Sequence, residues 1–401
     1  MAPGLVDDIE TAARFGGEGT GVTRLAWSDE LRAVYDWLSG QLEELGLDVE
    51  VDAAGNLIGR WQAGSGTAVV VGSHLDTVSS GGRYDGALGV LSGLHAIRLL
   101  KERGIEPKRP LWLVAFTDEE GARFGTALFG SRAFTGEDMR ELGGRRDADG
   151  VSLREAMAGR GLDLDDVPRA RAVDDVDAYL ELHIEQGPVL ESRGVEIGIV
   201  TGIAGQIAFQ ARFAGEANHA GTTPMRLRRD ALCGAAAAIL ALRDAALLRE
   251  DITTNVGVIA VEPGASNVVP GAATFSIDAR SATWEGYAAL EPLVRDTLGR
   301  IAGEQELELE LRETSHHEPL PLAPEMIDVL ERAAEAQGAT HMRLPSGAGH
   351  DAMVIGRHVP SGMLFVPSRN GVSHSPNEFT TPEHCELGAR ILARALEELL
   401  A

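Results

Sequence analysis

Four short apolar runs, each followed directly by a polar cluster, constrain the fold of this 401-residue chain more than any other feature. The runs are Val69–Val71, Leu111–Phe116, Tyr179–Ile184 and Met363–Val366, and the clusters after them are SHLD, TDEE, EQG and PSRN. Runs of this kind, bounded by glycine and polar residues, are typical of buried strands in an α/β sheet. Because open α/β sheets place their sites beyond the carboxyl ends of the strands, the pattern predicts a site built from these clusters.

The middle of the chain, residues 206–321, has a different pattern. Ile207, Phe209, Ala211 and Phe213 alternate with other residues, as in a half-exposed strand. After it we expect a helix, two strands, a second helix and a last strand, over about 226–246, 253–262, Phe275 to Ala279, 284–301 and 306–312. This βαββαβ order predicts a small ferredoxin-like α+β domain, inserted into a larger α/β domain formed by residues 1–205 and 322–401. The larger fold is expected to resume with a helix over 324–337.

Composition excludes several classes of function. The chain has 36 Lys+Arg against 61 Asp+Glu, a formal charge of −25, which argues against binding nucleic acid or an anionic membrane through a basic surface. Its only cysteines, Cys233 and Cys385, cannot form a disulfide framework or a cysteine-rich zinc site. The N-terminus is acidic, unlike a signal peptide, and no apolar stretch approaches the ~20 residues of a membrane helix. We therefore expect a cytoplasmic protein.

Lysine chemistry is also excluded by the sequence. The only lysines, Lys101 and Lys108, lie in the polar segment KERGIEPKRP. Schiff-base catalysis, or a carbamylated lysine between two metals, needs a lysine in a protected pocket. Neither Lys101 nor Lys108 is placed for that, so the sequence argues against both chemistries.

The polar clusters carry the side chains of a metal site. They contain His74 with Asp76 and Asp85, then Glu119 and Glu120, then His183, and finally His374. Imidazole and carboxylate ligands without thiolates suit Zn, Mn, Co or Ni, and a carboxylate can bridge two cations. The adjacent Glu119 and Glu120 point different ways, so one can bind metal while the other accepts a proton from water. Bound metal activates water and polarises a carbonyl, which predicts a hydrolase. The structural alternatives are that Asp85 is a turn aspartate and that the glutamate pair begins a helix.

Eight motifs, in order along the chain, resemble one known family, and the resemblance runs from about residue 15 to 390. They are GSHLDTV, GGRYDGALGV, TDEEGARFG, HIEQGP, AGEANHAGTTPM, NVVPG, GAGHDA and GVSHSPNEF. Together they resemble the hydantoinase/carbamoylase branch of the M20 metallopeptidase-like amidohydrolases. This branch contains N-carbamoyl-L-amino-acid hydrolases, allantoate amidohydrolases, ureidoglycolate hydrolases and β-ureidopropionases. A histidine at position 183 favours it, because related peptidases generally have a carboxylate there.

The resemblance implies two divalent metal ions per subunit that share Asp85. His74 and His183 would complete one metal site, and Glu120 and His374 the other. Glu119 would be the general base, and Asp76 would resemble a carboxylate that orients a ligand imidazole.

The resemblance also implies residues that bind a small ureido carboxylate. They are Gln186, His219, Asn267, Arg280, Gly349 and His350. Arg280 could grip the substrate carboxylate bidentately, although it could also be a surface ion pair, and Asn267 could simply cap a turn. His219 would reach the site of the partner subunit and stabilise the oxyanion, which implies a homodimer formed through the inserted lid domain.

The activity expected from the motifs is hydrolysis of N-carbamoyl-L-amino acids to the amino acid, CO₂ and ammonia. Allantoate hydrolysis is the main alternative. β-Ureidopropionase and peptidase activities fit the motifs less well, and a catalytically silent dimeric binding protein would have no reason to keep five ligands and a base.

Overall fold

The computed structural model describes residues 4–401, which divide into two compact units. Unit 1 consists of the residues up to Thr201 together with Leu322–Leu344 and Ala348–Ala401. Unit 2 consists of Gly202–Pro321 and Pro345–Gly347. The sequence placed the first division four residues later, after residue 205, and the second at the same position, after residue 321. No helix among residues 4–401 is long and apolar enough to cross a membrane.

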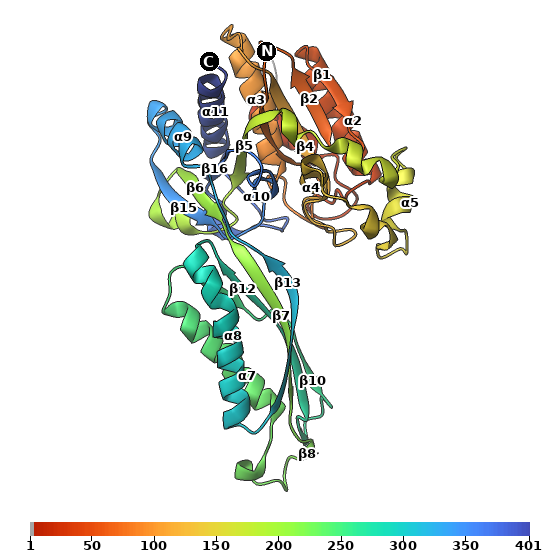
Figure 1. Cartoon of the computed structure of the whole chain (residues 1–401), viewed down its shortest axis with the longest axis vertical. Coiled ribbons are helices and arrows are strands. Elements are labelled where there is room, and N and C mark those ends of the chain that lie inside the picture. Colours follow the sequence, from red (N-terminus) through yellow and green to blue (C-terminus); the bar gives the residue numbers. More distant parts are fainter. Residues whose placement is uncertain (1–3) are drawn as a thin grey trace. The chain divides into compact units, whose positions relative to one another are not determined.

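The main sheet of unit 1 is mixed, with four parallel strands at its centre (Figure 1). In spatial order its strands are β1 (Asp48–Val51), β2 (Leu57–Trp61), β4 (Leu111–Phe116), β3 (Ala68–His74), β5 (Val176–Ile184), β16 (Ser361–Val366) and β6 (Ile197–Ile203). The parallel strands β4, β3, β5 and β16 are the four apolar runs of the sequence. Almost every residue in them is buried, as expected for strands covered on both faces. The prediction of a buried parallel sheet is therefore confirmed.

Two further short strands extend this sheet from β6. β15 (His341–Ser346) pairs with β6. β14 (Leu320–Pro321) pairs antiparallel with the last two residues of β6, Gly202 and Ile203. β6 itself runs antiparallel to β16.

Helices cover the sheet of unit 1, and their ends follow local sequence signals. They are α1 (Leu5–Ala13), α2 (Asp29–Glu44), α3 (Ala87–Glu102), α4 (Phe129–Thr135), α5 (Leu153–Ala158), α6 (Val189–Arg193), α9 (Pro324–Ala336), α10 (Asp351–Ile355) and α11 (Pro382–Leu399). Short 3₁₀ turns occupy Arg140–Gly144, Leu164–Ala170, Val173–Asp175 and Arg369–Gly371. The side chain of Ser28 accepts a hydrogen bond from Leu31 N and so begins α2, and Thr381 does the same at α11.

The alternation of side chains along β5 decides which residues reach the site. Leu182 packs against α11, near Gly388. Glu181 points the other way, toward α10, where it accepts a hydrogen bond from Ala352 N. His183 lies two residues further on the same face as Glu181, because side chains repeat with a period of two along a strand. The face of the sheet that carries α10 therefore holds the imidazole of His183.

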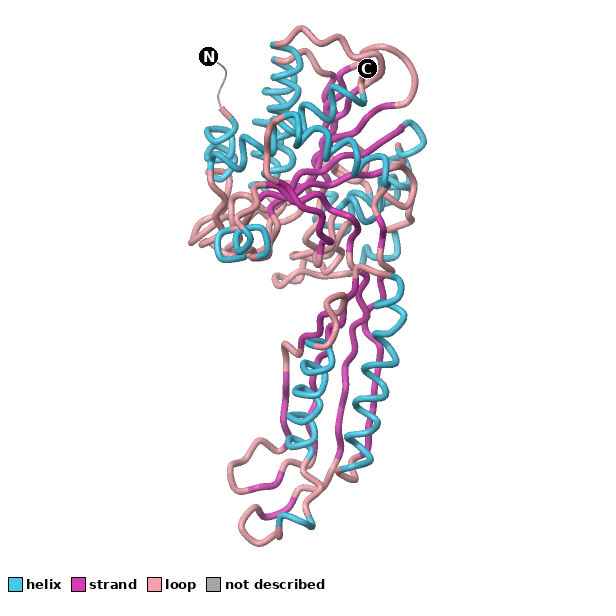
Figure 2. Tube along the Cα trace, turned by 90° about the vertical axis from the view of Figure 1, so that its left-hand side faces the viewer, coloured by secondary structure: helices cyan, strands magenta, loops and turns pink. Residues whose placement is uncertain are grey.

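Unit 2 is an antiparallel sheet with two long helices on one side (Figures 1 and 2). Its strands, in sheet order, are β10 (Ile259–Glu262), β12 (Ala272–Ser281), β7 (Gly205–Ala214) and β13 (Glu308–His317), with β9 (Thr253–Asn255) also paired to β12. The helices are α7 (Ala231–Leu247) and α8 (Trp284–Glu304), and a two-stranded ribbon joins β8 (Asn218–His219) to β11 (Val268–Val269). The alternating residues of β7, from Ile207 to Phe213, face the core between sheet and helices, as predicted.

Several predicted boundaries in unit 2 are wrong. The first helix begins at Ala231 and not near 226, because Asp230 caps it and Met225–Leu227 forms a separate 3₁₀ turn. The strand expected over 253–262 is broken at residues 256–258, where the Ser276 side chain accepts the hydrogen bond of Val258 N. The last strand runs to His317 and not to 312, because ten-residue β7 offers it partners as far as Gln206. The predicted helix near 284–301 extends to Glu304.

Candidate metal centre

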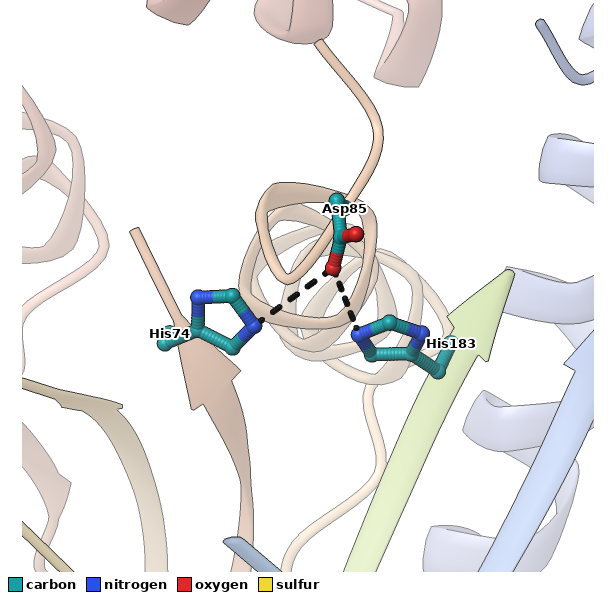
Figure 3. Close-up of side chains that lie close together, drawn as sticks. All are labelled: His74, Asp85 and His183. Carbon is teal, nitrogen blue, oxygen red and sulfur yellow. Dashed lines mark ion pairs between the residues drawn. The ribbon is translucent and has the colours of Figure 1, made fainter. Parts of the chain in front are cut away.

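Asp85 lies at the centre of the polar clusters that follow the parallel strands. Its Oδ1 is 3.7 Å from Nε2 of His74 and 3.2 Å from Nε2 of His183 (Figure 3). All three side chains are almost completely buried. His74 ends β3 and His183 lies near the end of β5, so neighbouring strand ends bring the two imidazoles together. Asp85 comes from the segment between β3 and α3, two residues before the helix begins. This is the first grouping that the resemblance implies.

In both His74 and His183, the two ring nitrogens have different partners: Nδ1 lies at a backbone carbonyl oxygen and Nε2 faces Asp85. His74 Nδ1 is 3.0 Å from the carbonyl oxygen of Asp76, and His183 Nδ1 is 2.9 Å from that of Ile184. A carbonyl oxygen only accepts, so Nδ1 of each ring carries a hydrogen and Nε2 of the neutral ring has a lone pair. Gly86 N also donates to His183 Nε2, at 3.2 Å. Both lone pairs therefore face an oxygen of Asp85 that is also an acceptor, an arrangement that needs a cation or an added proton between them.

A second grouping uses the other oxygen of Asp85. Its Oδ2 is 3.4 Å from Nε2 of His374, and the same nitrogen is 3.4 Å from Oε2 of Glu120. Glu120 Oε1 is buried and has no hydrogen-bond partner among the described residues. The two groupings thus share Asp85 through different oxygens, as a bridging carboxylate requires.

The donor set fits two divalent ions. Metal–nitrogen and metal–oxygen bonds of about 2.0–2.2 Å put the ligand atoms of a tetrahedral site about 3.4 Å apart. The four donor separations, 3.2–3.7 Å, lie around that value. Nitrogen and carboxylate donors suit zinc and its neighbours in the first transition row.

The charges of the cluster also call for a cation. Although burial opposes it, the histidines His183 and His374 hold the pKa of Asp85 well below its usual range. Burial, with the charge of Asp85, raises the pKa of Glu120 to about 8. Burial also raises the pKa of Glu119 well above its usual range, with further contributions from Asp351 and Glu120. Buried carboxylates at this spacing cannot all ionise without positive charge among them.

Backbone geometry turns the chain into the site after three of the four parallel strands, β4, β5 and β16. Asp118, Gln186 and His374 have φ of +57°, +58° and +53°, in the left-handed region that non-glycine residues rarely adopt. Such residues cost about 1–3 kcal/mol each and cluster at functional sites. Gly86, with φ +63°, is needed for space as well, since a Cβ there would lie 2.4 Å from the His74 ring.

Asp76 departs in part from its expected role. Its carboxylate is 3.9 Å from His74 Nδ1, beyond hydrogen-bond distance, and the imidazole is held by the Asp76 carbonyl. The carboxylate accepts hydrogen bonds from Glu119 N (3.3 Å) and Glu120 N (3.2 Å). It fixes the backbone of the glutamate pair because the turn after β3 points it toward the end of β4.

Gln186 and His350 lie against the candidate metal ligands. Beside His350, Gly349 borders open space, since a Cβ built there would meet nothing within 4 Å apart from its chain neighbours. Gln186 Nε2 donates to Asp85 Oδ2 at 2.9 Å. The ring of His350 is buried, with its centroid 4.6 Å from that of His183. Burial and the neighbouring His183 lower the pKa of His350 well below its usual range, so the ring is neutral.

The other three predicted substrate residues lie in unit 2. His219 is exposed on β8, where its main chain pairs with Val268 of β11. Asn267 directly precedes β11. Arg280, near the end of β12, is held by Asp278, which accepts from Nε (2.8 Å) and Nη2 (3.0 Å), and by the carbonyl of Gly347 (2.8 Å). Their roles toward a substrate stay predictions.

Two buried carboxylates of the site were not singled out from the sequence. Glu181 accepts hydrogen bonds from Ser73 Oγ, Tyr179 OH and Ala352 N. Its oxygens lie near His183 and His350 in a third grouping, and they already accept these three hydrogen bonds. Glu378 accepts from the backbone beside Asp85. Glu181 could have been found from its position two residues before His183 on the same strand face, and Glu378 from its place in the GVSHSPNEF motif.

A shared carboxylate between two histidine–carboxylate groupings, at the ends of parallel strands, defines the class of protein as a metal-dependent hydrolase. Residues 70–398 match the model of peptidase family M20/M25/M40. The chain is 43% identical over 382 residues to an N-carbamoyl-L-amino acid amidohydrolase of Geobacillus stearothermophilus, covering 94% of this chain and 93% of that enzyme. It is 39% identical to an allantoate amidohydrolase of Bacillus subtilis (strain 168), covering 98% and 97%.

A solved structure of an amidase of the hydantoinase/carbamoylase family from Burkholderia multivorans has the same fold. Its TM-score is 0.92 at 36% identity, over 99% of this chain and 97% of that one. The chain belongs to the M20/M25/M40 peptidase family and, within it, to the hydantoinase/carbamoylase branch of metal-dependent amidohydrolases. The resemblance seen in the sequence is confirmed, and the family implies divalent metal ions.

Proposed function

We propose that this protein hydrolyses the ureido C–N bond of N-carbamoyl-L-amino acids. The observation that carries the proposal is the pair of histidine–carboxylate groupings that use separate oxygens of Asp85. Similarity to an N-carbamoyl-L-amino acid amidohydrolase over almost the whole chain supports this choice of substrate.

His74, His183 and Asp85 Oδ1 would hold one divalent ion, and Glu120, His374 and Asp85 Oδ2 the other. Zinc, manganese, cobalt and nickel all suit these ligands. When bound, such ions supply Lewis-acid polarisation of a carbonyl and lower the pKa of water toward neutrality.

Glu119 is proposed as the general base. Its Oε2 is 3.6 Å from His74 Nε2, beside the cluster, and its backbone N is held by Asp76. Its carboxylate takes a proton from the attacking water and gives it to the nitrogen that leaves as the free amine of the amino acid. The other product, carbamic acid, decomposes to CO₂ and ammonia. One water is consumed and no oxidant or reductant is needed.

Substrate contacts are proposed for both units. Asp278 occupies the Nε side of the Arg280 guanidinium, which has further N–H groups to bind a carboxylate. Gln186 and His350 lie at the metal cluster, and His219 and Asn267 in unit 2. Gly349 precedes His350 in the same turn and would allow a substrate to approach the backbone.

Dimerisation through unit 2 is part of the proposal. Leu232, Leu240 and Leu247 are 37%, 50% and 77% exposed along α7, and Val258 is 65% exposed beside edge strand β10. Exposed apolar side chains along one helix and beside an open strand edge favour a protein–protein interface there. His219 would then act in the site of the partner subunit, as a donor to the oxyanion.

Allantoate hydrolysis is the second candidate, supported by 39% identity to an allantoate amidohydrolase over 98% of the chain. β-Ureidopropionase and peptidase activities, and a silent binding role, fit less well with the complete set of ligands and base.

The first test of the mechanism is ammonia release by Glu119→Gln after reconstitution with Mn²⁺. We expect two bound ions per subunit and a rate at least about 10²–10⁴-fold below that of the unmodified protein, the usual contribution of a positioned base. Full activity in this variant would show that Glu119 is not the base.

A further inference from the structure

Glu378 is a buried carboxylate that belongs to neither metal grouping. Its side chain is 5% exposed, and Oε1 accepts hydrogen bonds from the backbone N of Tyr84 (2.9 Å) and of Asp85 (3.0 Å). It lies in the loop after β16, four residues beyond His374. One side chain therefore connects the loop that carries His374 to the backbone of the shared carboxylate.

Ser373 extends this connection to the side chain of Asp85. Its Oγ is 2.8 Å from Asp85 Oδ2 and 3.1 Å from Glu378 Oε2, and its single hydrogen can be donated to one of these oxygens at a time. Gln186 Nε2 donates to the same Asp85 oxygen. The main chain of Asp85 and its Oδ2 are thus both fixed, which leaves Oδ1 directed at His74 and His183.

The chain before Asp85 is shaped to admit the Glu378 carboxylate. A Cβ built at Gly82 would lie 2.0 Å from Glu378 Oε1 and 2.6 Å from its Cβ, and the three nearest atoms all belong to Glu378. Gly82 does not have a left-handed φ, so what it provides is space. Any larger residue at position 82 would have to displace Glu378.

We propose that Glu378 is a positioning residue for the bridging Asp85. By holding the main chain of Asp85 directly and by keeping Ser373 Oγ between its own carboxylate and Asp85 Oδ2, it keeps the two oxygens of Asp85 aimed at two different metal sites. This inference rests on the proposed dinuclear site. Residues that orient metal ligands typically change metal affinity or activity by about 10–100-fold when they are removed, and we expect Glu378→Ala to weaken Mn²⁺ binding by that factor.

The matched variant is Glu378→Gln. The amide oxygen can accept from both backbone N–H groups, and the amide nitrogen can donate to Ser373 Oγ, which keeps its own hydrogen for Asp85. We expect this variant to bind Mn²⁺ within about threefold of the unmodified protein, well inside the 10–100-fold loss expected on removal. Glu383→Ala, an exposed change at the start of nearby α11, is the control for general effects in this region.

The experiment titrates each metal-free protein with Mn²⁺ by calorimetry and records the thermal midpoint with and without the ion. A 10–100-fold loss for Glu378→Ala with recovery in Glu378→Gln supports the proposal. Should Glu378→Ala fold poorly, Gly82→Ala displaces the same carboxylate from the other side and must show the same loss. A lower metal-free midpoint with unchanged Mn²⁺ affinity would make Glu378 merely structural and overturn the inference. If the unmodified protein binds no Mn²⁺, both the proposed dinuclear site and this inference fail. If the unmodified protein binds two ions and Glu378→Ala binds two ions with equal affinity, only this inference fails.

Discussion

Replacement of Glu181 by alanine should lower the free energy of unfolding of the protein. The side chain is fully buried and joins β3, β5 and α10 through its bonds to Ser73, Tyr179 and Ala352. In Glu181→Ala, Tyr179 OH keeps an acceptor in the carbonyl of Gly72. The Ser73 hydroxyl and Ala352 N have no other acceptor among the hydrogen bonds described for residues 4–401. Two buried donors left unsatisfied cost about 1–3 kcal/mol each, so the free energy of unfolding should fall by about 2–6 kcal/mol.

The isosteric change Glu181→Gln gives the contrast. Its amide oxygen can still accept from Ala352 N and Tyr179 OH, but its amide nitrogen donates to Ser73 Oγ, so the hydroxyl hydrogen of Ser73 loses its acceptor. We therefore expect a loss of about 1–3 kcal/mol, about half of that for Glu181→Ala. Urea unfolding of the metal-free proteins measures both, with Glu102→Ala, an exposed change at the end of α3, expected within about 0.5 kcal/mol of the unmodified protein. Equal losses for the two Glu181 variants, or a loss below about 1 kcal/mol for Glu181→Ala, would refute the reasoning.

Four further outcomes follow from the structure. Asp278→Ala should release the guanidinium of Arg280 and raise KM for a carboxylate substrate about tenfold with a smaller change in kcat, because charge-assisted hydrogen bonds contribute about 1.5–3 kcal/mol; an unchanged KM would argue against the clamp. A thiol reagent should modify exposed Cys233 in the native protein, and buried Cys385, whose pKa burial raises to about 12, only after unfolding. Because its carboxylate neighbours raise the pKa of His374 to about 9, Mn²⁺ must displace a proton from it; apparent affinity should rise from pH 6 to about pH 9, with proton release seen by an indicator dye. Chelation should lower the thermal midpoint and abolish ammonia release, and added divalent ion should restore both.

The central sheet was predictable because its strands have a strong local signal. β4, with all six residues buried, reads as a single apolar run, and it ends where the polar residues begin. The start of α7 was less predictable, because the polar segment before Asp230 contains helix-compatible residues that form a 3₁₀ turn in the fold. The extension of β13 to His317 depends on the length of its partner β7, a tertiary fact that its own sequence does not encode.

The gathering of site residues could be predicted for those that follow strands, since parallel strand ends lie side by side. His74 and His183 are examples, and their convergence on Asp85 follows from the sheet order. The two buried glutamates that support them were missed although the sequence carried a signal for each: Glu181 stands two residues before His183 on the same strand face, and Glu378 lies in the GVSHSPNEF motif. For Asp76, the resemblance implied a carboxylate that orients the His74 imidazole, but this carboxylate accepts hydrogen bonds from backbone amides in the loop after β4.

The most direct test of the central claim is ammonia release by Mn²⁺-reconstituted protein with N-carbamoyl-L-amino acids, their D-isomers and allantoate as separate substrates, alongside metal analysis. We expect about two ions per subunit and turnover of the L-carbamoyl amino acids with the D-isomers untouched. Turnover of allantoate alone would keep the metal centre and replace the proposed substrate. Protein that binds no divalent ion and releases no ammonia from any of these substrates would contradict the account.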